Sequence, residues 1–175
     1  MNALTDRELI LRARGGNAEA VGELTTRYQT SVFNVCYRMT HERREAEDLA
    51  QETFLRVYSR LDLFDLERDF SPWVRRVAAN ICLNHFETQK PTVEIDDERL
   101  ADENNRPESV YENRERTELI RKAIASLPVN YRVVVELRHF QELSYDEISA
   151  ALSIPVSDVK SHLFRARKIL AEKLK

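Results

Sequence analysis

Residues 143–170 read LSYDEISAALSIPVSDVKSHLFRARKIL and carry the start signals of two successive helices. Ser144, with Glu147 three residues later, is a capping-box pattern that predicts a short helix. Pro155 occupies the position of a first helical residue and predicts a second, longer helix. A short helix, a tight connection and a longer helix are the outline of a helix-turn-helix, whose second helix lies in the major groove of DNA.

The second of these helices has two chemically different faces. At about 100° per residue, its inner stripe consists of Val159, Leu163, Ala166 and Leu170. On the other face, Lys and Arg can reach phosphates or guanine edges, Ser can bond either, and a phenyl ring can touch thymine methyls. The alternative is a merely solvated face, with Phe164 packed on a neighbouring domain. The candidate DNA-binding residues of this face are Ser157, Lys160, Ser161, Phe164, Arg165 and Lys168.

The composition of the 175-residue chain predicts an all-α fold, because three glycines and five prolines leave little room for a turn-rich β architecture. Lys plus Arg (27) nearly balances Asp plus Glu (30), so a nucleic-acid surface must come from segregated charge. Cys36 and Cys82 lie in separate apolar patterns, and we expect buried free thiols in a reducing cytosol. The N-terminus lacks a signal-peptide pattern and the apolar runs are short, which predicts a cytoplasmic protein without a membrane span.

Four helices are predicted before residue 87. The first begins at the capping box of Thr5 and Glu8, and Gly15–Gly16 end it. Asn17 caps a long second helix that ends near residue 40. A third runs to about residue 61, and a fourth starts at Ser71–Pro72, a cap followed by proline, and continues to about residue 86.

The helical pattern lapses between residues 87 and 108, which read ETQKPTVEIDDERLADENNRPE. Two prolines and an acidic excess predict a flexible linker there. Helices resume at a capping box of Ser109 and Glu112 and at a helix over about 129–140. We therefore expect two small helical domains, residues 1–86 and 109–175, joined by the linker 87–108. The buried stripe expected after Ser109 consists of Leu119, Ile120, Ala123, Ile124 and Leu127.

The third predicted helix places a leucine on its polar side. Leu55 lies about 180° around the helix from Ala46, which belongs to the inner face. Its outer neighbours are Asp48, Gln51 and Glu52. An exposed leucine ringed by acids predicts a docking surface for a basic, partly apolar helix of another protein. Singly exposed leucines are also common on protein surfaces, which is the plainer alternative.

The fourth predicted helix combines aromatic, amide and basic side chains. Single-stranded DNA needs aromatic faces for stacking, donors for base edges and positive charge for the backbone. Phe64 and Phe70 in the preceding loop add aromatic character. The alternative for Trp73 is a core role, since it begins the inner stripe 73, 77, 81. The candidate residues of the helix are Trp73, Arg75, Arg76, Asn80 and Asn84.

Three segments in order resemble the extracytoplasmic-function (ECF) sigma factors, the compact class of bacterial RNA polymerase sigma factors within the sigma-70 superfamily. AEDLAQETFLRVYSRLDLF (46–64) is similar to the family's polymerase-binding helix, and FSPWVRRVAANICLNHF (70–86) to its -10 element segment. Residues 127–170 resemble its -35 reader, with Ser153 in the turn where the family frequently has glycine. The resemblance implies that residues 1–86 are sigma region 2 and 109–175 sigma region 4.

The resemblance also implies roles for the candidate residues. Asp48, Gln51, Glu52 and Leu55 would bind core RNA polymerase. Phe64, Trp73, Arg76, Asn80 and Asn84 would bind the melted -10 strand, and the outward residues of the last helix would read the -35 duplex. An anti-sigma factor, often membrane-bound, would control the protein.

No cofactor, metal or catalytic residue is expected, because His41, His85, His139 and His162 have no metal-ligand spacing and no phosphate-binding glycine loop is present. This makes a helical enzyme the weakest of the alternatives. A second alternative is a stand-alone helix-turn-helix regulator that binds palindromic duplex DNA as a dimer. Such a regulator would have no use for an exposed Leu55.

Overall fold

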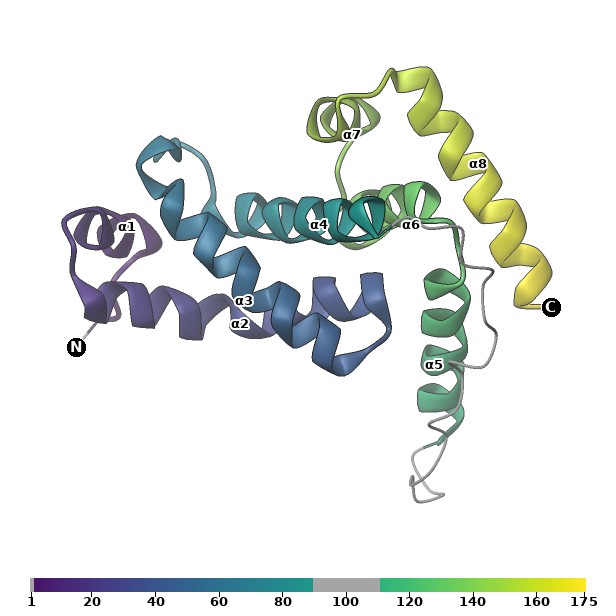
Figure 1. Cartoon of the computed structure of the whole chain (residues 1–175), viewed down its shortest axis with the longest axis horizontal. Coiled ribbons are helices and arrows are strands. Elements are labelled where there is room, and N and C mark those ends of the chain that lie inside the picture. Colours follow the sequence, from purple (N-terminus) through teal and green to yellow (C-terminus); the bar gives the residue numbers. More distant parts are fainter. Residues whose placement is uncertain (1, 90–110) are drawn as a thin grey trace.

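The structure, a computed structural model, describes residues 2–89 and 111–175, and of 111–113 only the backbone. Within these ranges the chain is helical with no β-strand, as the composition predicts (Figure 1). We call residues 2–89 the N-terminal module and residues 111–175 the C-terminal module. Most of the predicted linker and the predicted Ser109 cap lie outside the described residues. No helix of the described part is both long and apolar enough to cross a lipid bilayer.

The N-terminal module consists of four α-helices and one short 3-10 turn. The Thr5–Glu8 capping box is present, and the Asn17 side chain accepts a hydrogen bond from the Ala20 amide, so both predicted caps are confirmed. The elements are α1 (Asp6–Arg14), α2 (Ala18–Thr40), α3 (Arg43–Ser59), η1 (Leu61–Leu63) and α4 (Phe70–Thr88).

The predicted start of α4 is wrong by two residues. The helix begins at Phe70, after Asp69 in the cap position, so Pro72 is its third residue rather than its first. Proline is tolerated there because amides of the first helical turn have no intrahelical partner. The helix also extends through Glu87 and Thr88, which the sequence places in the linker.

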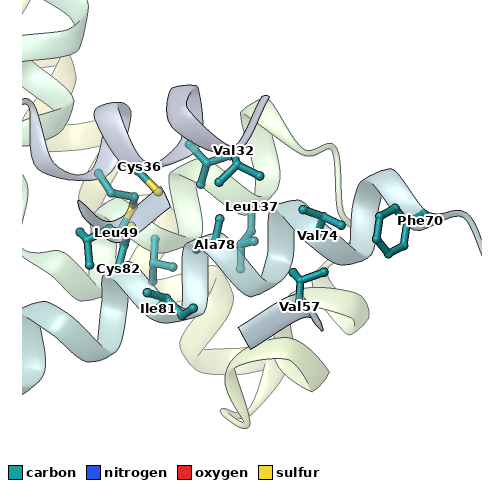
Figure 2. Packing of buried hydrophobic residues seen from close by; sticks show 14 of the residues in the cluster. Val32, Cys36, Leu49, Val57, Phe70, Val74, Ala78, Ile81, Cys82 and Leu137 are labelled. Atoms are coloured by element: carbon teal, nitrogen blue, oxygen red, sulfur yellow. The ribbon is translucent and has the colours of Figure 1, made fainter. Parts of the chain in front are cut away.

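The core of the N-terminal module lies between α2, α3 and α4 (Figure 2). Val32 and Cys36 come from α2, and Val74 and Cys82 from α4. Cys36 and Cys82 are buried free thiols, as predicted. The hydrogen bond with Cys36, together with burial, raises the pKa of the Cys82 thiol and keeps it protonated.

The C-terminal module contains the predicted helix-turn-helix and two preceding segments. The predicted helix over 129–140 is an α-helix followed by a π-helical turn, closed by a hydrogen bond from the Gln141 amide to the Glu136 carbonyl. The elements are α5 (Tyr111–Ala125), α6 (Val129–Val135), η3 (Glu136–Phe140), α7 (Tyr145–Leu152) and α8 (Val156–Lys173).

The buried stripe predicted after Ser109 is confirmed at three of its five residues. Ala123, Ile124 and Leu127 are buried, but Leu119 is 59% exposed and Ile120 37%. Leu119 and Ile120 lie one turn nearer than Ala123 to the N-terminal end of α5, and Figure 1 shows this end pointing away from the other helices.

The two modules pack directly against each other. α6 and η3 lie on α2 and α4, and α5 also contacts α2. Leu137 of the C-terminal module belongs to the same buried cluster as Val74 and Ala78 of α4 (Figure 2). One hydrophobic cluster therefore continues from the N-terminal module into the C-terminal module. A second, smaller cluster of Leu127, Val135 and Ala166 lies within the C-terminal module.

Candidate nucleic-acid and protein interfaces

The α7–α8 pair has the geometry of a helix-turn-helix. Ser144 and Glu147 form the predicted capping box at the start of α7, with both hydrogen bonds at 3.1 Å. These bonds lower the pKa of the Glu147 carboxyl group. Ser153 ends α7 in the left-handed conformation at φ 55°, and its amide donates to the Ser149 carbonyl. Pro155 is the N-cap residue of α8 rather than its first residue.

The outer face of α8 is open to solvent, as its periodicity predicts. Phe164 is 69% exposed, whereas Val159, Leu163 and Ala166 are buried against the rest of the module. The Arg165 guanidinium donates to the Tyr131 hydroxyl at 3.2 Å, so α6 orients this side chain. Ser157, Lys160, Arg165 and Lys168 are exposed and Ser161 is half-buried. The structure therefore brings the six candidate DNA-binding residues together on one face.

The outer face of α3 carries the second candidate surface. Leu55 is 73% exposed, which confirms its predicted outward position. Leu49, Thr53 and Val57 are buried on the opposite side, against the module core. Asp48, Gln51 and Glu52 are exposed around Leu55, at helical spacings of three, four and seven residues. The result is an apolar centre with a polar and acidic rim, which suits a protein partner with basic residues.

The third candidate surface is a stripe along α4. Trp73, Arg76, Asn80 and Asn84 recur at steps of three and four residues and so share one side of the helix. Asn84 is exposed and the other three are half-buried. The Arg76 side chain is held along the helix by a 3.3 Å hydrogen bond to the Pro72 carbonyl. Arg75 lies on a different side of α4 from this stripe. Its backbone carbonyl accepts a hydrogen bond from the Gln141 side chain of the C-terminal module.

Phe64 is placed differently from the other candidates. Its ring is 7% exposed and packs against Phe70 and Trp73, at centroid distances of 5.3 Å and 4.9 Å. Its carbonyl accepts a 2.5 Å hydrogen bond from the Arg14 guanidinium, which fixes the loop to α1. The ring supports Trp73 from within this cluster and is not open to solvent. The neighbouring Leu63 is 83% exposed instead.

The exposure of Leu63 was missed by reasoning from the sequence. A signal was present, since Leu63 has Asp62 and Asp65 close by in the sequence, as Leu55 has acidic residues around it. The described residues contain no cluster of three or more His, Cys, Asp or Glu side chains placed to bind a metal ion. The candidate binding residues lie on the outer faces of α3 and α8 and along one side of α4.

Comparisons with known proteins match both modules. The family model for Sigma-70 region 2 matches residues 24–92, and the model for Sigma-70 region 4 matches residues 117–170. The ECF RNA polymerase sigma factor SigW of Bacillus subtilis is 32% identical, over 97% of this chain and 96% of SigW. The ECF RNA polymerase sigma-E factor of Escherichia coli K12 is 31% identical, over 98% of this chain and 95% of that protein.

Solved structures share the fold as well. CnrH, in its complex with the cytosolic domain of CnrY, superposes with a TM-score of 0.64 at 23% identity, over 97% of this chain and 96% of CnrH. The sigma factor RpoE of Bartonella quintana, in its complex with the anti-sigma factor NepR, gives 0.63 at 17% identity, over 87% of this chain and 95% of RpoE. With both sigma regions matched and relatives aligned over nearly the whole length, the chain belongs to the ECF family of RNA polymerase sigma factors.

Proposed function

We propose that this protein binds core RNA polymerase and directs it to promoters by contacting a -10 and a -35 element. The observation that carries the proposal is the nearly full-length match to ECF sigma factors, combined with outward-facing candidate residues in both matched regions. The protein acts through binding energy, so it needs no catalytic residue. A stand-alone dimeric regulator is not favoured, because the region 2 match would then have no role.

The α3 surface is the proposed contact with polymerase. Leu55 offers an apolar anchor, and Asp48, Gln51 and Glu52 surround it with acceptors for basic residues of the partner. Anchors of this kind contribute most of the energy of a protein interface, whereas the rim contributes specificity and association rate.

The α4 stripe is the proposed contact with the melted -10 strand. Trp73 supplies an aromatic face, Asn80 and Asn84 supply donors and acceptors for base edges, and Arg76 supplies charge for the backbone. Phe64 has an indirect role: its ring packs against Trp73, at 4.9 Å between ring centroids, and holds the Trp73 ring in place.

The outer face of α8 is the proposed reader of the -35 duplex. Lys160, Arg165 and Lys168 provide positive charge, while Ser157 and Ser161 provide hydroxyl groups for phosphate or base edges. Phe164 provides apolar contact to thymine methyl groups or sugars. Because phosphate contacts dominate such binding, the affinity for DNA falls steeply as salt rises.

An anti-sigma factor is the proposed regulatory partner. RpoE of Bartonella quintana, which shares the fold, was solved with the anti-sigma factor NepR bound. Family membership of this chain makes the same class of regulator the natural expectation.

Replacement of Leu55 by Asp tests the polymerase contact. The expected result is binding to core RNA polymerase at least about 30-fold weaker, roughly 2 kcal/mol, because the charge removes an interface anchor. Binding is measured by fluorescence anisotropy of labelled sigma factor, and initiation by run-off transcription from the source bacterium's own upstream regions. Leu11→Asp is the matched control, since Leu11 is an exposed leucine (49%) on α1, away from the surface. Unchanged binding by Leu55→Asp would refute the contact, and failure of the unaltered chain to initiate anywhere would refute the function.

A further inference from the structure

A buried ion pair joins the two modules across a sequence separation of 98 residues. Arg38 of α2 donates to both carboxylate oxygens of Glu136 in η3, from Nε at 2.7 Å and from Nη2 at 2.8 Å. Only 2% of the Glu136 side chain and 20% of the Arg38 side chain are exposed. This two-point geometry is the strongest arrangement available to a guanidinium and a carboxylate.

Further polar contacts surround this pair. The side-chain amide of Gln141 donates from Nε2 to Glu136 Oε1 and to the backbone carbonyl of Arg75 in α4, both at 3.2 Å. The Phe140 ring covers the Arg38 guanidinium at 4.4 Å. The π-helical turn over Glu136–Phe140 is what directs these C-terminal side chains to one point.

Arg132 forms a second connection between the modules. Its guanidinium donates to the Met39 carbonyl at the end of α2 and to the Ala125 and Leu127 carbonyls of its own module, the latter two at 2.7 Å and 2.8 Å. It also lies 5.1 Å from the centre of the Phe86 ring of α4. A cation at the C-terminal ends of two helices is favourably placed with respect to both helix dipoles. The modules are therefore held by directed polar contacts as well as by apolar packing.

The packed arrangement is too small to contact both promoter elements. A compact chain of this length has a radius of gyration of roughly 16 Å and a diameter of about 40 Å. The -10 and -35 elements lie about 25 base pairs apart, which at 3.4 Å per base pair is roughly 85 Å. If the proposed function holds, the modules must separate before both elements are bound.

The packed arrangement also affects the -10 stripe. Arg76 of α4 lies close enough to Glu147 at the start of α7 to lower the pKa of that carboxyl group, although the capping-box bonds lower it more. The packed arrangement therefore brings a carboxylate of α7 within electrostatic range of one of the proposed -10 contact residues.

We propose that the Arg38–Glu136 pair, with Gln141, is a latch that holds the free protein closed, and that the latch must open for promoter binding. Such a latch is reversible because both charged groups regain water when the modules separate. Within the closed form, in contrast, loss of either partner leaves the other buried without its counter-charge. Apolar residues such as Leu137 are uncovered on opening, so the closed form is the resting state in the absence of polymerase and DNA.

Distance measurement between the modules tests the latch without polymerase or DNA. Spin labels are attached to Ser59→Cys on α3 and Glu172→Cys on α8, both exposed positions, whereas the native Cys36 and Cys82 are fully buried. Double electron–electron resonance then gives the distribution of distances. The labelled protein without further substitutions is expected to show one predominant population, in which the modules are closed.

Arg38→Met is expected to shift the ratio of open to closed forms by at least about tenfold, because it leaves Glu136 buried without its cation. Adding Glu136→Leu to Arg38→Met is expected to restore the closed population, since two apolar side chains can replace a buried ion pair. Arg43→Met is the matched control: it removes an arginine from the exposed Arg43–Glu47 pair within α3 and should leave the distances unchanged.

A distance distribution of Arg38→Met identical to that of the control would overturn the latch. Glu136→Gln provides a second test, because the amide keeps the shape of the side chain and removes only its charge; it too must increase the open population. Far-ultraviolet circular dichroism establishes that each variant is folded. Since neither measurement involves polymerase, the latch and the proposed function can fail independently.

Discussion

Three non-glycine residues of the described chain adopt the left-handed backbone conformation, and two of them end helices. His41 ends α2 at φ 53°, and Ser153 ends α7 at φ 55°. The third, Glu142 at φ 59°, follows the π-helical turn. An L-residue with a β-carbon is less stable than glycine in this conformation, because the β-carbon approaches the following carbonyl oxygen. Ser153 lies in the turn of the helix-turn-helix, where the conformation is required to redirect the chain into α8.

Ser153→Gly is therefore expected to stabilise the protein by about 1 kcal/mol and to raise Tm by roughly 2–4 °C. Thermal unfolding followed by circular dichroism measures the shift. Ala150→Gly, at an exposed position inside α7, is the control and is expected to destabilise by about 1 kcal/mol. A lower Tm for Ser153→Gly would mean that the serine side chain stabilises the turn by more than the backbone strain it causes.

At the scale of single elements, replacement of Arg165 tests the proposed -35 contact of the outer face of α8. If Arg165 contacts a base through two hydrogen bonds, Arg165→Ala weakens binding to a -35 duplex by about 1–3 kcal/mol and relaxes the preference at one base pair. Anisotropy titrations at fixed salt compare a duplex selected by the protein with a scrambled duplex. Arg44→Ala, which removes the same charge from the first turn of α3, is the control. Equal losses on both duplexes would instead identify Arg165 as a phosphate contact.

The elements differ in how far the sequence predicts them, because their determinants lie at different distances along the chain. The capping boxes at Thr5 and Ser144 and the outward positions of Leu55 and Phe164 follow from residues within two helical turns, and the structure confirms them. The π-helical turn does not follow from local pattern. This turn directs Glu136 toward Arg38. The spacing of apolar residues along a helix cannot predict a contact with a residue 98 positions away.

The candidate sites show the same division. The α3 and α8 surfaces depend only on helical period, so their residues could be found from the sequence. The position of the Phe64 ring depends instead on contacts with Phe70, Trp73 and Arg14, which belong to other elements. The sequence therefore identifies the aromatic cluster but not which of its loop residues is exposed.

At the scale of the whole molecule, the shared hydrophobic cluster determines how the chain unfolds. The cluster includes Leu24 and Val35 from the N-terminal module and Val133, Leu137 and Ile148 from the C-terminal module. Separation of the modules exposes part of this cluster to water and also breaks the Arg38–Glu136 pair. Unfolding of one module therefore removes packing from the other, which couples their stabilities.

We expect the unaltered protein to unfold in one cooperative transition, with equal van't Hoff and calorimetric enthalpies. Arg38→Met weakens the coupling, so its transition should broaden or divide into two and its van't Hoff enthalpy should fall below the calorimetric value. Differential scanning calorimetry at low protein concentration measures both quantities, and Arg43→Met again serves as the control. Two separated transitions in the unaltered protein would contradict the expectation, because the modules would then be stable independently and the contacts between them would contribute little to the folded state.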